Sequence, residues 1–186
     1  MIEELKNYLN VTIKSKKRLE HIYSVVEFSK TLANIHSLSK EKMTIAALSH
    51  DLFRDVKTDK LIKISHIYGI TLDQFDKIKP ILLHGKIGAE FLRRKYKIDD
   101  EIYQAVYYHT SGYEHMKKIG KALVISDSAA DGRDYDGLEE LRKISFSSLD
   151  EGYKLVIKNK INYALLKNRF ILEQTVKTWN KMCRVE

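Results

Sequence analysis

The sequence has only one cysteine, Cys183, so no disulfide can form within the chain. We therefore expect a reducing compartment. One proline and eight glycines are too few for a loop-rich or disordered protein. Uninterrupted apolar runs reach only about four residues, whereas a membrane-spanning helix needs about 18 or more. The segment from Met1 to Lys14 lacks the apolar stretch of a secretory signal. We therefore expect a cytoplasmic protein with no membrane partner.

The remaining composition favours one helical domain. The 186 residues are 44% hydrophobic, enough for one sizeable core, and no linker or internal repeat divides residues 1–186. Lys, Leu, Ile, Glu and Ala are abundant, and all of them occur readily in helices. The sequence thus predicts an all-α fold in a single domain. We expect helices near residues 2–9, 17–35, 40–52, 58–67, 72–78, 86–96, 99–109, 115–130, 137–145, 148–167 and 173–182.

The net charge of +8 raises the question of a nucleic-acid partner. The densest basic cluster comprises Lys14, Lys16, Lys17 and Arg18, but lysines are spread over the whole chain and do not alternate with aromatic residues as a stacking surface would require. We therefore expect no nucleic-acid partner. A moderately basic surface can instead attract a small polyanion such as a nucleotide polyphosphate.

Histidine and aspartate are the residues in this chain that point to chemistry. His50 and Asp51 are adjacent at the end of an apolar helical stretch, and four further potential metal ligands are His21, His84, His109 and Asp127. Imidazoles and carboxylates suit divalent metals, and such a metal can turn water into a nucleophile near neutral pH. The pattern therefore indicates a metal-dependent hydrolase.

Helical periodicity places several of these polar residues on apolar faces. His21 begins an apolar stripe that runs to Leu32 in steps of four and three residues, and His109 and Asp127 follow apolar residues at similar intervals. Any one of the histidines, taken alone, is equally well explained as a satisfied core imidazole. Asp127 is different, because an unpaired buried carboxylate costs several kcal/mol. A cation shared by several of these residues explains the set best.

Five local strings occur in a fixed order along the chain. They are Arg18-Leu19-Glu20-His21, Leu48-Ser49-His50-Asp51, Leu82-Leu83-His84-Gly85, Tyr108-His109-Thr110-Ser111-Gly112, and Ser126-Asp127 followed by Gly132-Arg133-Asp134. Together they resemble the HD-domain superfamily and, within it, the bacterial YqeK-type family of symmetrical diadenosine tetraphosphate hydrolases. The resemblance covers residues from about 15 to 180.

The resemblance implies an HD-domain helical bundle that hydrolyses diadenosine tetraphosphate, or a close dinucleoside polyphosphate, into two ADP. It implies iron, as one or two ions, held by His21, His50, Asp51 and Asp127. His84 and His109 would complete a second metal position or contact phosphate, and the sequence leaves both roles open. Asp51 would bridge two ions, and a metal-bound hydroxide would attack phosphorus. Asp51, His84 and His109 are accordingly the expected catalytic residues.

Several residues near these strings are expected to hold the substrate, namely Arg18, Arg54, Lys86, Thr110 and Arg133. For Arg18 and Arg54 an ordinary solvated helix face is an equal alternative. For Arg133 the rival is a salt bridge within its acid-rich turn, to Asp131, Asp134 or Asp136.

Other functions and contacts stay open at this stage. The same metal set would serve a mononucleotide phosphohydrolase, and a nucleotide-binding module with a vestigial metal site is the alternative outside enzymes. The aromatic group Tyr103, Tyr107, Tyr108 and Tyr113 has near-helical spacing, so packing explains it better than base stacking. The C-terminal string Leu172-Glu173-Gln174-Thr175 departs from the family pattern, which leaves the base preference open. A homodimer is also left open.

Overall fold

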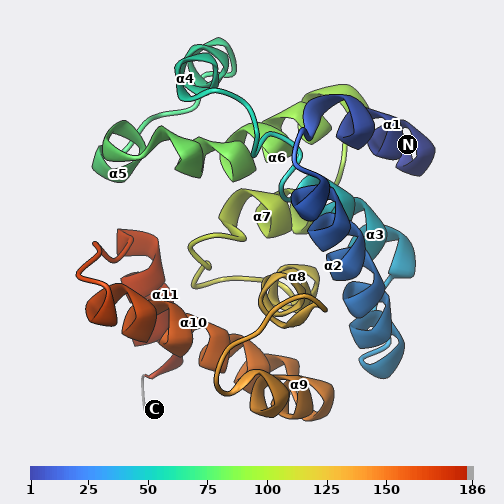
Figure 1. The fold of residues 1–186 in the computed structure, drawn as a ribbon, viewed down its shortest axis with the longest axis vertical. Helices are drawn as coiled ribbons and strands as arrows, with labels where there is room; N and C mark the ends of the chain where they lie inside the picture. Colours follow the sequence, from blue (N-terminus) through green and yellow to red (C-terminus); the bar gives the residue numbers. More distant parts are fainter. Residues whose placement is uncertain (184–186) are drawn as a thin grey trace.

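The computed structural model describes residues 1–183, and these residues form helices and no strand, which confirms the all-α expectation (Figure 1). The elements are α1 (Ile2–Thr12), α2 (Lys16–Ile35), α3 (Lys40–Ser49), α4 (Thr58–Ile67), α5 (Gln74–Ile78), the 3₁₀ helix η1 (Pro80–Leu82), α6 (Leu83–Tyr96), α7 (Asp100–Tyr108), α8 (Lys118–Ala129), α9 (Leu138–Ser147), α10 (Leu149–Leu166) and α11 (Glu173–Met182). Within the described residues no helix combines the length and apolar character needed to cross a membrane.

Helix α8 is the central element of the bundle. It contacts α2, α3, α7, α9 and α10, and Figure 1 shows it between α2 and α3 on one side and α10 on another. Its apolar run Ala122–Ile125 is fully buried, as are Ile119 and Ala129. A helix that is apolar on nearly all sides is stable only when other helices surround it. This apolar run therefore explains why the other helices pack around α8.

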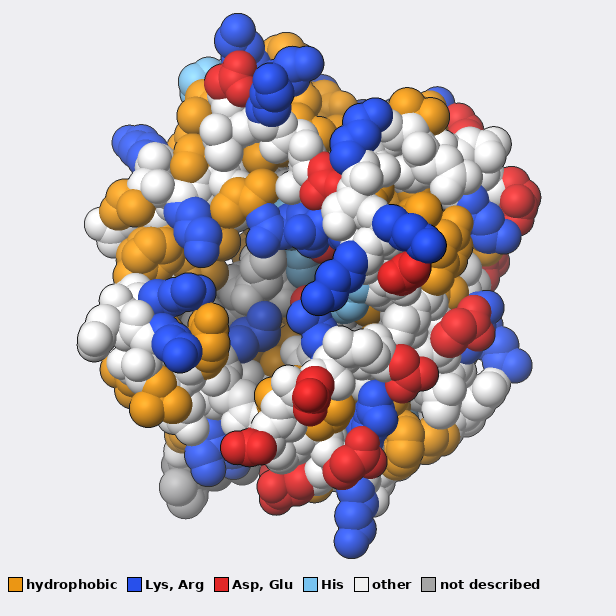
Figure 2. Space-filling view, in the orientation of Figure 1, with side chains coloured by type: hydrophobic (Ala, Val, Ile, Leu, Met, Phe, Trp, Pro, Cys, Tyr) orange, Lys and Arg blue, Asp and Glu red, His pale blue; other side chains and the backbone are white. Residues whose placement is uncertain are grey.

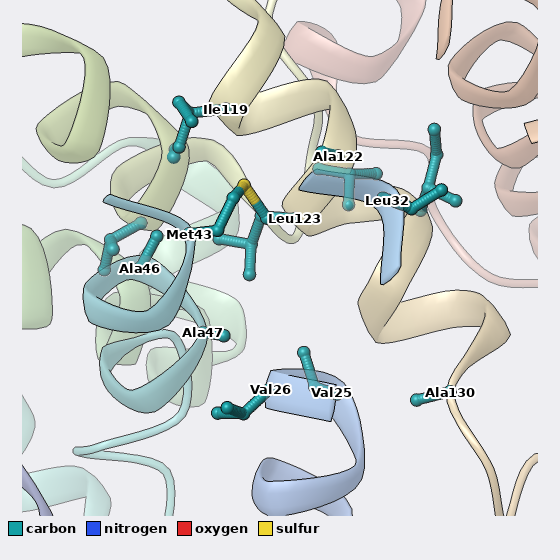
Figure 3. Close-up of a cluster of buried hydrophobic side chains, with 14 of the residues drawn as sticks. Val25, Val26, Leu32, Met43, Ala46, Ala47, Ile119, Ala122, Leu123 and Ala130 are labelled. Carbon is teal, nitrogen blue, oxygen red and sulfur yellow. The ribbon is translucent and has the colours of Figure 1, made fainter. Parts of the chain in front are cut away.

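Small side chains allow α2, α3 and α8 to pack closely around a common core (Figure 3). Val25 of α2, Met43 of α3 and Leu123 of α8 are fully buried in it. Ala46, Ala47 and Ala122 lie among these larger residues and have no exposed surface. Because alanine adds only one carbon beyond the backbone, the helix axes can approach closely and bring the polar ends of the three helices together.

A second, smaller hydrophobic cluster joins α4 to α6. Its buried members are Leu61, Ile70, Leu83 and Ile87. Leu83 is the first residue of α6, which starts three residues earlier than the periodicity predicts. His84 therefore lies in the first turn of a helix that is fixed on both sides by apolar neighbours.

Hydroxyl and carboxyl side chains cap the helices that carry the polar residues. Ser15 accepts a hydrogen bond from the backbone N–H of Arg18 at the start of α2, and Asp99 accepts one from Ile102 at the start of α7. After α7 the chain reverses at Gly112, whose φ of +76° is unfavourable for other residues. A Cβ at Gly112 would also lie 2.5 Å from Ile157 Cδ1, so both the turn and the packing require glycine.

We expect Leu123→Ala to lower the free energy of unfolding by about 2–5 kcal/mol, because it leaves a cavity beside α2 and α3. In a chain of this size the melting temperature should fall by about 4–20 °C. Leu166→Ala is the matched control, because Leu166 is 81% exposed and its truncation should change stability little. Thermal unfolding followed by circular dichroism measures both, and equal shifts would contradict the central position of α8.

Candidate functional site

The six His and Asp residues of the expected site come from five different helices and converge on one cavity of about 450 Å³. His21 lies on α2, His50 and Asp51 follow the end of α3, His84 lies in the first turn of α6, His109 follows α7, and Asp127 lies on α8. Five of them line the cavity, while His50 is fully buried beneath it. His50 contacts the rings of both His21 and His109, with ring centroids 5.7 and 5.3 Å apart.

Three of the histidines are each held by a hydrogen bond of the same kind, from the ring to the backbone. The Nδ1 atoms of His50, His84 and His109 lie 2.6–2.8 Å from the carbonyl oxygen three residues earlier in the chain. A carbonyl oxygen can only accept, so Nδ1 carries the proton in each ring. In the neutral form the Nε2 atom of each ring therefore presents a lone pair.

Two of these Nε2 lone pairs, those of His84 and His109, point toward each other. His84 Nε2 lies 3.0 Å from His109 Nε2, and the buried His50 Nε2 has no hydrogen-bond partner among the described residues. Burial, with the nearby His84 and His50, lowers the pKa of His109 to about 3, so this ring is neutral. Two facing lone pairs repel unless a cation lies between or beside them. The three rings are thus oriented for a ligand that accepts electron pairs.

Asp51 lies between two groups of potential ligands. One group is His21, His50 and Asp51, and the other is Asp51, His84 and His109, with all ligand atoms of a group within 4.8 Å of one another. Burial raises the pKa of Asp51, but the nearby His50, His84 and His109 lower it by more. The pKa of Asp51 therefore lies well below its ordinary value. Asp51 is therefore an ionised carboxylate and the one residue common to both groups.

Asp127 and His21 form the opposite side of the cluster. His21 Nε2 lies 3.0 Å from Asp127 Oδ1, and the Arg133 guanidinium donates to the same oxygen at 2.8 Å. Burial raises the pKa of Asp127, but His21, His50 and Lys160 outweigh it and hold the pKa well below its ordinary value. The Asp127 side chain is 20% exposed, so it is partly open to the cavity and not fully buried as its position on an apolar stripe predicts.

The donor set fits a divalent transition metal. Ligands about 2.1 Å from one ion and at right angles to each other are about 3.0 Å apart. The observed separations are 3.0 Å for His21 Nε2 and Asp127 Oδ1, and 3.1 Å for His84 Nε2 and Asp51 Oδ1. Imidazole nitrogen mixed with carboxylate oxygen suits iron, manganese, zinc or cobalt. The unpartnered His50 Nε2 is the clearest sign that a ligand completes the site.

Basic side chains surround this cluster. Figure 2 shows a hollow in this face of the molecule, with Lys and Arg side chains around it and histidine at its edge. The basic residues that line the cavity are Lys17, Arg18, Arg54, Lys79 and Arg133. These five cations outnumber the two carboxylates, Asp51 and Asp127, that line the same cavity, so the cavity favours a small anion.

Arg18 is already held in place by two carboxylates. Its Nη1 donates to Asp51 Oδ2 and its Nε donates to Asp55 Oδ1, each at 2.9 Å. Asp55 also accepts from the backbone N–H groups of Lys14 and Ser15. The solvated-face alternative for Arg18 is therefore wrong, because its guanidinium lies against the cluster.

Glycines let α6 approach the other helices at the site. A Cβ on Gly85 would lie 2.9 Å from His109 Cε1 and 2.9 Å from the Val106 carbonyl oxygen. A Cβ on Gly88 would lie 3.3 Å from the Ser49 carbonyl oxygen. Gly85 therefore makes room for the His109 ring itself, and this close approach is what brings His84 and His109 into contact.

Two of the expected substrate-binding residues, Lys86 and Thr110, line a cavity next to the central one. Lys86 lies in a neighbouring cavity of about 190 Å³, where it pairs with Asp73 and Asp76. Thr110 lines both this cavity and the central one. Arg133 does form a salt bridge, but its partner is Asp127 and not one of the turn carboxylates that the rival interpretation named, and it also lies 3.2 Å from His21 Nε2. The turn carboxylate Asp131 pairs with Arg142 instead.

Three lysines at or beside the site were not predicted from the sequence as site residues. Lys17 and Lys79 line the central cavity, and Lys160 of α10 donates to the Thr110 carbonyl oxygen at 3.0 Å. Burial lowers the pKa of Lys160, against the opposing effect of Asp127. A detectable signal existed for Lys160, because it follows the buried Val156 and Ile157 at helical spacing. The sequence around Lys79 gives no signal that it belongs to the site, because Lys79 lies between α5 and η1 and reaches the cavity only in the folded chain.

A helical bundle that gathers six His and Asp side chains in a basic cavity has the features of a metal-dependent phosphohydrolase. The chain belongs to the HD domain family, whose family model matches residues 18–162.

Two relatives of the chain carry the same name. It is 28% identical over 172 residues to the Halalkalibacterium halodurans protein named bis(5'-nucleosyl)-tetraphosphatase, symmetrical, with 90% of each chain covered. It is 27% identical over 168 residues to the Staphylococcus aureus protein of the same name, with 89% of this chain and 86% of that protein covered. A crystal structure of an HD superfamily hydrolase from Clostridium acetobutylicum, described as involved in NAD metabolism, superimposes with a TM-score of 0.90 at 28% identity, covering 98% of this chain and 96% of that chain.

We expect Asp51→Asn to lower metal affinity by more than about tenfold, because the amide cannot supply the charge shared by both ligand groups. The variant should stay folded, since the shape of the side chain is kept. Asp55→Asn is the matched control, because Asp55 also pairs with Arg18 but lies outside the two ligand groups. Elemental analysis and circular dichroism on both variants test this, and full metal content in Asp51→Asn would contradict the site.

Proposed function

We propose that the protein hydrolyses diadenosine tetraphosphate, or a close dinucleoside polyphosphate, symmetrically to two nucleoside diphosphates. The observation that carries the proposal is the convergence of three Nδ1-anchored imidazoles on Asp51 beneath a basic cavity. The names of the relatives, at 27–28% identity over almost the whole chain, supply the substrate class.

The proposal assigns metal binding to His21, His50, Asp51 and Asp127, and gives His84 and His109 to a second ion or to the reacting phosphate. Iron is part of the proposal, since the ligand types alone accept several divalent metals. A bound metal supplies an activated water near neutral pH and offsets charge on phosphoryl oxygens. Asp51 is the proposed bridging ligand, because it belongs to both groups of ligand atoms.

The protein's own part is to hold the phosphate chain. Arg18 is bonded to Asp51 and Arg133 to Asp127, so each guanidinium lies against a different carboxylate of the cluster. Arg54, Lys17 and Lys79 add positive charge along the cavity wall. In the proposed complex these cations hold two phosphates on each side of the attacked position, which would produce symmetric cleavage.

The alternatives from the sequence make different demands on this site. A mononucleotide phosphohydrolase needs to hold only one nucleotide, whereas five basic residues line this cavity and two of them, Arg18 and Arg133, lie against different carboxylates. A vestigial binding module would be expected to have lost at least one of His50, Asp51 and Asp127, and all are present and in contact.

A single domain over residues 1–186, a cytoplasmic location and a homodimer stay predictions; residues 184–186 lie outside the described residues.

We expect ADP to be the only nucleotide product from diadenosine tetraphosphate, because the proposed binding mode places two phosphates on each side of the attacked position. Ion-exchange chromatography of the reaction mixture measures this directly. Equal amounts of AMP and ATP would contradict the proposed placement. Release of inorganic phosphate from mononucleotides alone would favour the mononucleotide phosphohydrolase.

We expect Arg133→Ala to lower kcat/KM by about 10- to 150-fold, since a hydrogen bond to a charged group contributes about 1.5–3 kcal/mol. Arg133→Lys should recover part of this loss, because a point charge cannot reproduce the bidentate fork. Arg142→Ala is the matched control: Arg142 pairs with Asp131 and Glu139 outside the central cavity, so kcat/KM should be unchanged. Steady-state kinetics on the three variants decides, and a change below about threefold in Arg133→Ala would exclude a role in catalysis.

A further inference from the structure

The central cavity shares two lining residues with each of two neighbouring cavities. On one side Leu82 and Thr110 line both the central cavity and the cavity of about 190 Å³ that holds Lys86. On the other side Asp127 and Arg133 line both the central cavity and a third one of about 350 Å³. We call these the Tyr108 cavity and the Tyr163 cavity, after one residue that lines each.

The Tyr163 cavity is mostly apolar and has a few polar groups at its wall. Tyr135, Val156 and Tyr163 supply aromatic and aliphatic surface, and Asn159 and Lys160 supply the polar groups. Tyr163 is 51% exposed although it lies beside the core-facing side of α10, and Tyr135 is 38% exposed. Its volume and its lining are those of sites that hold a flat organic group with a polar edge.

The positions of Tyr135 and Lys160 in this cavity are fixed. The Tyr135 hydroxyl donates to the Ser128 carbonyl oxygen at 3.0 Å, and the Lys160 ammonium donates to the Thr110 carbonyl oxygen at 3.0 Å. The Lys160 bond ties α10 to the loop after His109. A group bound against Tyr135 and Tyr163 would therefore lie next to a cation on the path from this cavity to Asp127.

The Tyr108 cavity also has aromatic walls, but it is smaller and more charged than the Tyr163 cavity. Tyr107 and Tyr108 line it together with Phe75, and Tyr108 stacks on Tyr113 with ring centroids 4.4 Å apart. Gln174 also lines it, and its buried Nε2 has no hydrogen-bond partner among residues 1–183. A buried amide without a partner favours a ligand that accepts a hydrogen bond there.

We propose that the Tyr163 cavity binds one nucleoside of the substrate while the Tyr108 cavity binds the other, with the phosphate chain crossing the central cavity between them. This inference rests on the proposed function. Its basis is the juxtaposition of two aromatic-walled cavities, each of which shares two lining residues with one basic cavity, and this matches a molecule with two nucleosides joined by phosphates. Aromatic side chains bind bases by stacking, and stacking tolerates any base because every base has a flat face.

The first test is a calorimetric titration of the metal-containing protein with ADP, the product that each half of the substrate would leave. Two ADP molecules should bind per chain. Tyr163→Ala should weaken one of the two by about fivefold or more, since stacking on an aromatic residue contributes at least that factor. Tyr163→Phe should keep both, because the ring remains.

The matched control is Phe146→Ala. Phe146 is 38% exposed, as Tyr135 is, but it stacks on Phe28 and lies outside the three cavities. It should bind two ADP molecules like the unchanged protein. One ADP per chain in the unchanged protein, or equal binding by Tyr163→Ala, would overturn the inference.

The second test compares hydrolysis of diadenosine tetraphosphate with that of adenosine 5'-tetraphosphate, which lacks the second nucleoside. Tyr163→Ala should lower kcat/KM for the dinucleoside substrate about fivefold or more and should reduce its advantage over the mononucleoside one. An unchanged ratio of the two kcat/KM values would overturn the inference.

The two proposals fail in different ways. Two ADP sites per chain, one of them dependent on Tyr163, without hydrolysis of diadenosine tetraphosphate would support the cavity assignment and refute the proposed function. Symmetric hydrolysis by a protein whose ADP binding and kinetics ignore Tyr163 would refute the cavity assignment and leave the proposed function in place.

Discussion

A hydrogen bond from Nδ1 to a backbone carbonyl, repeated in His50, His84 and His109, is the constraint on which the site depends. Because the partner is backbone, the ring orientation follows from the position of the histidine in its helical turn and needs no further side chain. His50 and His109 directly follow helices, where the last carbonyls lack partners within the helix. One bond thus satisfies a helix end, fixes the tautomer and turns each Nε2 toward Asp51.

The anchors can converge only because the helices that carry them approach closely. Gly85 leaves room for the His109 ring, and alanines such as Ala46 and Ala122 leave room between α2, α3 and α8. Larger side chains at these positions would widen the bundle and separate the Nε2 atoms by more than one ion can span. Close packing of the core and ligand geometry are therefore one requirement, and a change that loosens the core should also weaken the site.

Local rules predicted much of this architecture from the sequence. The stripe that starts at His21 ends at the fully buried Leu32, and the residues before Asp127 on α8 are buried as periodicity predicts. What could not be predicted depends on contacts between distant elements. Arg133 turns back to Asp127 in preference to the acidic residues beside it, and Lys86 faces the neighbouring cavity because α5 presents Asp73 to it. Sequence spacing describes one helix at a time and carries no information on which helix lies opposite.

The cations around the cluster show why the basic character of the chain is more than a solvated surface. Arg18 is held by Asp51 and Asp55 at once, and Arg133 by Asp127, so two guanidinium groups are ordered before any anion arrives. A free lysine on a surface loses rotamer entropy when it binds phosphate, whereas a guanidinium that is already fixed loses less. The same carboxylates are candidate metal ligands, so a bound metal would compete for their charge. Arg18 and Arg133 would then be freer to donate to a phosphate, which couples the metal and substrate positions through Asp51 and Asp127.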